Sequence, residues 1–264
     1  MSGLVSLTIR ELKKWYKQPF VLVISIVQPV IWMTLFGKAF NLNALAPPGS
    51  GGAFQELFGT SDYFSFMAVG MLSFVVLFAT MFSGMSIVWD RRLGFLNKVL
   101  STPVSRGSII LSKVFNAVTR SLIQCGIVLV AAVALGLKVN SGFHPIYLVG
   151  VFAGLFLMSL GLASLFVLIA IRSKRWETQV AIMNLLNLPL LFASNALFPT
   201  RLMPDWLAAF AKINPVTHGT EIARQLILQS PNWDTLAGDF MFLGVFAAIF
   251  AFIGILLSWR YLSK

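Results

Sequence analysis

Long apolar runs separated by short polar segments dominate this chain. A helix needs about 20 mostly apolar residues to cross the hydrocarbon core of a bilayer. Six segments approach or exceed that length, at residues 20–37, 64–89, 114–137, 145–171, 180–197 and 240–259. Asn184, Asn187, Pro189 and Asn195 interrupt the fifth. The pattern predicts an all-α integral membrane protein, in which residues 1–264 form a single transmembrane domain with six transmembrane helices.

Residues 4–17 precede the first span and have an amphipathic pattern. At about 100° per residue, the basic side chains share one face and most of the apolar ones lie opposite. The basic face holds Arg10, Lys13, Lys14 and Lys17, and the apolar face Leu4, Val5, Leu12, Trp15 and Tyr16. Such a helix lies in the headgroup layer, against anionic membrane lipid. The alternative is a basic tail that only follows the charge rule for membrane topology.

The segment between the second and third spans predicts a short helix at residues 91–101. Its apolar residues recur at helical spacing, and Pro103 ends the pattern. These apolar residues are Leu93, Leu96, Val99 and Leu100. A helix at this place lies across one end of the bundle and can present side chains to a partner.

The segment before the last span predicts a hairpin at residues 204–228. Its first apolar stripe is Trp206, Leu207, Phe210 and Ile213, and its second is Ile222, Ala223, Leu226 and Ile227. Asn214-Pro215 between them has the pattern of a helix N-cap followed by proline at the first helical position. Glu221 and Arg224 are expected on the polar side. Because neither helix is long enough to cross the bilayer, we expect a re-entrant hairpin at the outer face.

Composition supports the membrane assignment, since 58% of residues are hydrophobic, 11% are charged and the mean hydropathy is +0.84. The formal charge is +11, but basic residues scattered between apolar runs indicate membrane topology rather than a nucleic-acid partner. With six spans, fourteen Lys and Arg residues fall on the side of the chain ends and five on the other. This asymmetry predicts a multi-pass protein of the cell membrane with both termini in the cytoplasm.

Little in the sequence predicts chemistry within this chain. No Asp or Glu lies inside a predicted span, so no buried carboxylate is expected, and the two histidines and single cysteine predict no metal site. There is no GxxxxGK[ST] phosphate loop. We therefore expect no cofactor and no catalytic residue in this chain, and an external energy source for any active transport. An intramembrane enzyme, a passive channel and a structural membrane protein are the alternatives.

Two patterns inside the spans leave two interpretations open. Lys113, Arg120 and Gln124 share one face of the third span. They line a cavity open to the cytoplasm, or Arg120 extends to the inner headgroups. Gly150 and Gly154 form a GxxxG pattern in the fourth span, which is either a packing face or a chance match.

Two stretches resemble the type-2 ATP-binding-cassette (ABC) exporter permeases. They are RRLGFLNKVLSTPVSRGSIILSK at residues 91–113 and FPTRLMPDWLAAFAKINPVTHGTEIAR at residues 198–224. The order of the elements is also similar, and the wording is most like daunorubicin-resistance-type drug exporters. Asp90-Arg91-Arg92 departs from the Glu-Arg-Glu-like run of many relatives.

The resemblance implies a partner, a cargo and functional positions. It implies export of a hydrophobic drug, lipid or lipid-linked glycan by two copies of this chain with two ABC ATPase subunits, which bind the ATP and Mg. Contact with the ATPase is implied for a coupling helix with Arg92, Gly94, Phe95, Leu96, Asn97 and Lys98. An outer gate is implied for Met203, Pro204, Trp206, Asn214, Pro215 and Arg224.

Overall fold

The computed structural model describes residues 3–39, 58–60, 62–102, 104–173 and 175–261. Within these ranges it contains helices and connecting turns and no strand. Five helices are long and apolar enough to cross a membrane: α2 (Pro19–Thr34, continued by the π-helix Leu35–Ala39), α5 (Tyr63–Arg92), α7 (Arg106–Ala134), α8 (Tyr147–Arg172) and α12 (Trp233–Tyr261). The prediction of an all-α integral membrane protein is confirmed.

The predicted fifth span overlaps α9 (Trp176–Phe192), which has 17 residues and is shorter than a usual transmembrane helix. The helix ends before Asn195, because the backbone turns after Phe192 and the carbonyl groups of Asn195 and Ala196 accept hydrogen bonds from a distant arginine. The count of six spans therefore stays a prediction.

Capping residues place the helix ends beyond the apolar runs. The Ser105 hydroxyl accepts a hydrogen bond from the Ser108 N–H at 3.3 Å, so α7 begins at Arg106 rather than near Val114. Asp62 caps α5 in the same way, through the Ser65 N–H at 3.2 Å. As a consequence, Lys113 and Asp90 belong to the two longest buried helices rather than to loops.

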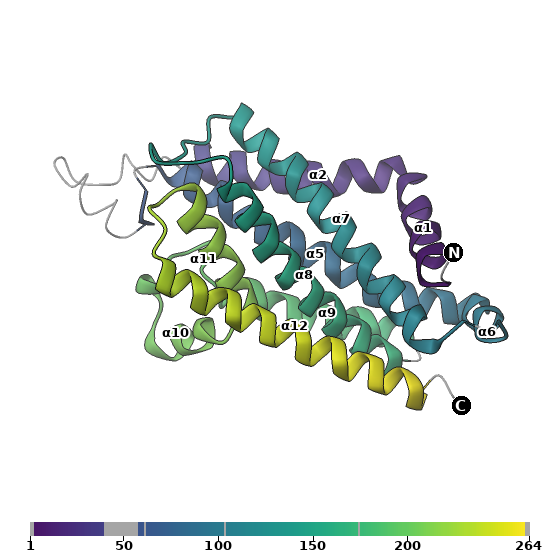
Figure 1. Ribbon diagram of the computed structural model, residues 1–264. Coiled ribbons are helices and arrows are strands. Elements are labelled where there is room, and N and C mark those ends of the chain that lie inside the picture. The colour runs from purple at the N-terminus through teal and green to yellow at the C-terminus, as the bar shows by residue number, and fades with distance from the viewer. Residues whose placement is uncertain (1–2, 40–57, 61, 103, 174, 262–264) are drawn as a thin grey trace.

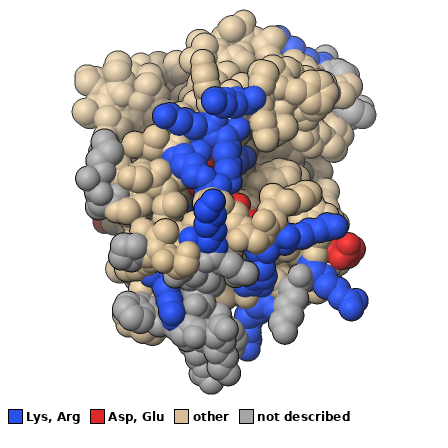
Figure 2. All heavy atoms as spheres, turned by 90° about the vertical axis from the view of Figure 1, so that its right-hand side faces the viewer, with Lys and Arg blue, Asp and Glu red and all other residues tan. Residues whose placement is uncertain are grey.

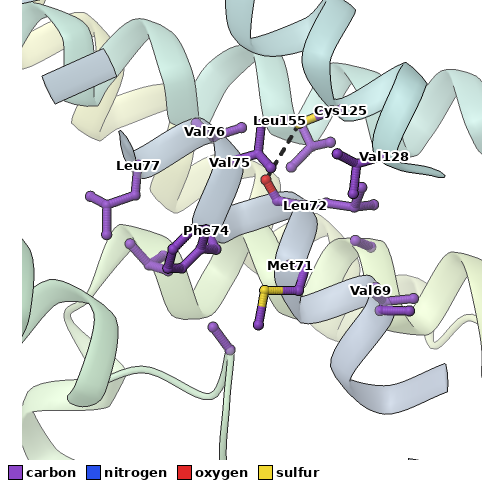
Figure 3. Close-up of a cluster of buried hydrophobic side chains, with 14 of the residues drawn as sticks. Val69, Met71, Leu72, Phe74, Val75, Val76, Leu77, Cys125, Val128 and Leu155 are labelled. Atoms are coloured by element: carbon purple, nitrogen blue, oxygen red, sulfur yellow. Dashed lines mark hydrogen bonds between the residues drawn. The ribbon is translucent and has the colours of Figure 1, made fainter. Parts of the chain in front are cut away.

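Helix α5 forms the axis of the bundle, with α7 and α8 packed along it and α12 along α8 (Figure 1). Figure 3 shows Met71, Leu72 and Val75 of α5 pointing into this core, beside Val128 of α7 and Leu155 of α8. The Cys125 thiol donates a hydrogen bond to the Leu72 carbonyl oxygen at 3.4 Å. By contrast, α2 lies at the periphery and exposes most of its side chains.

The GxxxG pattern of α8 is a packing face. The residues opposite it belong to α11 (Pro215–Ile227): Leu226 lies over Gly150 and Ile222 over Gly154. A Cβ on Gly154 would lie 2.8 Å from Cγ2 of Ile222, so the close approach depends on glycine.

The two ends of the bundle differ in their elements and charge. The short helices α1 (Gly3–Tyr16) and α6 (Phe95–Leu100) lie at one end, together with the last turns of α12 (Figure 1). Lys and Arg side chains gather there, as Figure 2 shows, and we call this the basic end. The opposite end carries α10 (Asp205–Lys212) and α11, and we call it the hairpin end.

Candidate functional site

Gly94 determines how α6 leaves the bundle. Its φ of +70° is unfavourable for other residues, and it reverses the chain between α5 and α6. Leu96 and Val99 of α6 are buried in a hydrophobic cluster with Ile109 and Ile110 of α7. Arg92 and Lys98 are exposed, and the side chain of Asn97 lies outside what the structure describes, as does Pro103. The helix is thus anchored by apolar residues while its charged positions face outward.

Phe95 connects α6 to α1. The Arg10 guanidinium lies 3.4 Å from the centre of the Phe95 ring, and the Lys14 ammonium lies 5.5 Å from it. Both distances are in the range of cation–π attraction. The sequence gave separate roles to the two helices, whereas the structure brings them into direct contact.

The expectation of no buried carboxylate is wrong. Glu11 and Asp90 are 8% and 6% exposed, and both form ion pairs with the buried Lys113. The Lys113 ammonium is 3.1 Å from Glu11, and Lys14 lies 3.2 Å from Glu11 and 3.4 Å from Asp90. Burial is tolerated because each carboxylate has basic partners. We call Glu11, Asp90, Lys14 and Lys113 the ion cluster.

The orientation of α1 explains why the sequence missed Glu11. Its buried face contains Glu11 and Trp15, which are four residues apart and share a side of the helix. Tyr16, expected on the apolar face with Trp15, is 76% exposed. The signal was the spacing of Glu11 and Trp15, but the basic residues around Glu11 made it resemble part of the polar face.

A groove of about 790 Å³ lies between α1, α2, α5 and α7. Arg120 and Gln124 of the predicted stripe line this groove, which favours the cavity interpretation. Lys113 does not line it, because its ammonium is held in the ion cluster. The Gln124 side-chain amide donates a hydrogen bond to the Ser25 hydroxyl at 2.6 Å and so connects α7 to α2.

At the hairpin end, Asn214 has the predicted role of N-cap. Its side-chain oxygen accepts from the Val216 N–H at 3.0 Å, with Pro215 at the first helical position. Its amide also donates to the carbonyl oxygens of Leu190 and Ala193, both at 2.8 Å, which ties the hairpin to the end of α9. Met203 and Pro204 lead into α10, where Trp206 is 66% exposed.

The two helices of the predicted hairpin differ in burial. The apolar stripe of α11 is packed inside the bundle, with Ile222 and Ala223 fully buried. The stripe of α10 instead projects from the bundle. Only α10 thus has the free apolar face that was expected of both.

Arg224 faces the protein interior, so its expected place on the polar side of α11 is wrong. It is 2% exposed and donates hydrogen bonds to the carbonyl oxygens of Asn195 at 2.6 Å, Ala196 at 2.9 Å and Phe66 at 3.4 Å. Burial lowers the pKa of its guanidinium to about 9, and the charges of Glu221 and Tyr63 oppose that change. Arg224 therefore stays mainly protonated at neutral pH. The carbonyl groups at the end of α9 explain its position, since the helix does not use them.

A second cavity of about 710 Å³ lies beside Arg224 at the hairpin end. His218 of α11 and Asp239 of α12 line it, with 2.7 Å between Nδ1 and the carboxylate oxygen. The other ring nitrogen of His218 lies 2.9 Å from the Lys212 carbonyl oxygen. These contacts join α10, α11 and α12 at the outer end of the bundle.

Together, the apolar helices, the helix α6 anchored at the basic end and the packed hairpin define a multi-pass membrane protein of the permease type. Residues 3–228 match the family described as ABC-2 type transporter, so this chain belongs to the ABC-2 type transporter permeases. The suspected resemblance is confirmed. This family provides membrane subunits that work with an ABC ATPase subunit.

Individual relatives match over most of their length. The chain is 33% identical to transport permease ycf38 of Cyanophora paradoxa, over 81% of this chain and 70% of that protein. It is 22% identical to the daunorubicin resistance ABC transporter permease protein DrrB1 of Streptomyces coeruleorubidus, over 79% and 69%. It is 28% identical to nodulation protein J of Rhizobium meliloti, over 69% and 70%. These relatives are transport proteins or carry a physiological name, and they agree with a transport subunit rather than an enzyme.

Proposed function

We propose that this chain is the permease of an ATP-driven exporter in which separate subunits hydrolyse ATP. Two copies of the chain associate with two ABC ATPase subunits, which hold ATP and Mg. The cargo is a hydrophobic drug, a lipid or a lipid-linked glycan. The relatives named for daunorubicin resistance and multidrug transport support a hydrophobic cargo.

The observation that carries this proposal is the mounting of α6. It is anchored in the apolar cluster by Leu96 and Val99 and contacts α1 through Phe95. A force applied to its exposed side is therefore transmitted to α7 through the cluster and to α1 through Arg10. Because α1 leads into α2, both walls of the groove are connected to α6.

The proposed orientation places the basic end in the cytoplasm, where the ATPase is found. The gathering of Lys and Arg at that end supports it (Figure 2). The hairpin end then faces outward, and α10 and α11 close the exit path as an outer gate. The exposed apolar faces of α2 and α12 are available to lipid and to the second copy.

The Phe95→Ala change tests the role of α6. It removes the ring beneath Arg10, and we expect the chain to insert normally while the co-purified ATPase loses most of its cargo-stimulated hydrolysis and export. Activity is measured in proteoliposomes with the full complex. Phe252→Ala is the matched control, because Phe252 is 63% exposed on α12 and away from α6. Unchanged hydrolysis and export with Phe95→Ala would show that α6 is only a connector, and failure of any ABC ATPase to co-purify with the unmodified chain would refute the proposal itself.

A further inference from the structure

The groove between α1, α2, α5 and α7 is polar in one part and apolar in the other. Glu11, Asp90, Asn116 and Arg120 line its polar part. Ile24 of α2 and Phe74, Phe78 and Phe82 of α5 line its apolar part. Its volume of about 790 Å³ is in the range of pockets that hold small ligands. Such a distribution matches an amphiphile, a molecule with a polar head and an apolar chain.

Positive charge exceeds negative charge at the polar part. Lys14 and Lys113 pair with Glu11 and Asp90, and Arg10 also lies 3.2 Å from Glu11. Arg120 adds a fourth cation, so these six described residues carry two positive charges in excess. The charge of the site therefore favours an anionic head over a neutral or cationic one.

Unused hydrogen-bond donors occur at the same place. Within the described part of the chain, three covered nitrogen atoms have no hydrogen-bond partner: Nε1 of Trp15, Nδ2 of Asn116 and Nε of Arg120. All three residues line the groove. Asn116 and Arg120 are one helical turn apart on α7, and the Arg120 guanidinium lies 5.6 Å from the Trp15 ring. Because buried donors are normally paired, the site is incomplete without a group that offers several acceptor oxygens.

The depth of Arg120 narrows the choice of ligand. It follows Lys113 by seven residues, which corresponds to about 10 Å along α7. It therefore lies deeper than the ion cluster, beside the apolar part of the groove. A charge at such depth is unfavourable unless a counter-charge reaches it. A ligand that carries its own apolar chain can bring an anionic group to this position, whereas a free ion must leave water to do so.

We propose that the groove binds an anionic membrane lipid, with its phosphate at Trp15, Asn116 and Arg120 and an acyl chain between α2 and α5. Phosphate oxygens accept hydrogen bonds from all three side chains and neutralise the excess charge. The chain then covers Ile24, Phe74 and Phe78. Binding requires neither nucleotide nor ATPase, so this site is testable independently of the transport function.

The test uses the full chain in lipid nanodiscs with trace photoreactive lipids. One probe has a phosphatidylglycerol head and the other a phosphatidylcholine head, and both carry the same photoreactive acyl chain. Labelled peptides of α2 and α5 are quantified by mass spectrometry. We expect about tenfold more groove labelling by the anionic probe, the preference equivalent to one charged hydrogen bond. Equal labelling by the two probes would overturn the proposal.

Variants then test whether Arg120 produces the preference. Arg120→Gln should reduce anionic labelling to the level of the neutral probe, and Arg120→Lys should retain most of it. Lys138→Gln is the matched charge control, because Lys138 is exposed beyond the far end of α7. If Arg120→Gln does not fold, Trp15→Phe and Asn116→Leu each remove one donor, and both should lower the preference. Preference unchanged by these variants, or abolished in the unmodified chain by inorganic phosphate, would refute a lipid site.

Discussion

Arg224 illustrates how one buried cation can hold several segments together. Its hydrogen bonds join α11 to the turn after α9 and to the start of α5, through carbonyl groups that have no partner within a helix. Each bond from a charged donor contributes about 1.5–3 kcal/mol, and an unsatisfied carbonyl adds a penalty when the donor is lost. The side chain therefore serves the packing of the hairpin end.

Replacing Arg224 should destabilise the protein strongly. We expect Arg224→Met to lower the free energy of unfolding by about 2–4 kcal/mol, because the carbonyl oxygens of Asn195 and Ala196 lose their donors. The measurement is thermal unfolding of the purified chain in detergent. Arg175→Met, at an exposed site, should have almost no effect. Equal melting temperatures for the two variants would argue against this role.

At this scale, the sequence predicted local features better than buried charge. The Asn214 cap and the proline after it were predictable, because capping depends on neighbouring residues. The positions of Glu11, Asp90 and Arg224 were not, since each depends on a partner far away in the chain. Glu11 and Asp90 share Lys113 on a third helix, and only tertiary packing brings them together.

Among the helices, the contact of α8 with α11 depends most clearly on shape. Gly150 and Gly154 provide a flat surface on α8, and Leu226 and Ile222 of α11 fill it. No charge or hydrogen bond is needed for this contact, so it is sensitive to the size of side chains.

A larger residue at Gly154 should separate these two helices. We expect Gly154→Val to destabilise the protein by about 1–3 kcal/mol, the usual effect of overpacking. Ile222→Ala should restore part of the loss, because it removes the atoms that the new side chain would meet. Thermal unfolding of the single and double variants measures both effects. Gly244→Val on α12 is the control, since no atom lies within 4 Å of the added Cβ. A double variant no more stable than Gly154→Val would contradict this packing.

Helix positions followed from hydropathy, but their ends and lengths did not. Each predicted span overlaps a helix, because apolar runs of this length have few alternatives in a membrane protein. Hydropathy does not detect the polar first turns of α7, which Ser105 caps, or the early end of α9. It also did not distinguish the buried α11 from the projecting α10, since both are amphipathic.

For the molecule as a whole, the asymmetry of charge predicts its orientation in the membrane. Cysteines at Lys98 and Leu202 test it, because both sites are exposed and lie at opposite ends. The background is Cys125→Ser, in which the serine hydroxyl can donate to the Leu72 carbonyl as the thiol does. An impermeant maleimide should label the Leu202→Cys variant in intact cells and the Lys98→Cys variant only after permeabilisation. Labelling in the reverse order would invert the proposed topology.

The ion cluster also has a consequence for synthesis. Glu11 and Asp90 emerge from the ribosome before Lys113, the buried cation that pairs with both. Until α7 is made, Asp90 lacks this partner and α2 lacks one of the two long helices that it packs against. The first two membrane helices thus wait for the third before they reach their final arrangement. A nascent chain arrested before residue 113 is expected to remain accessible to the insertion machinery, whereas one extended beyond α7 is released into the bilayer as a packed unit.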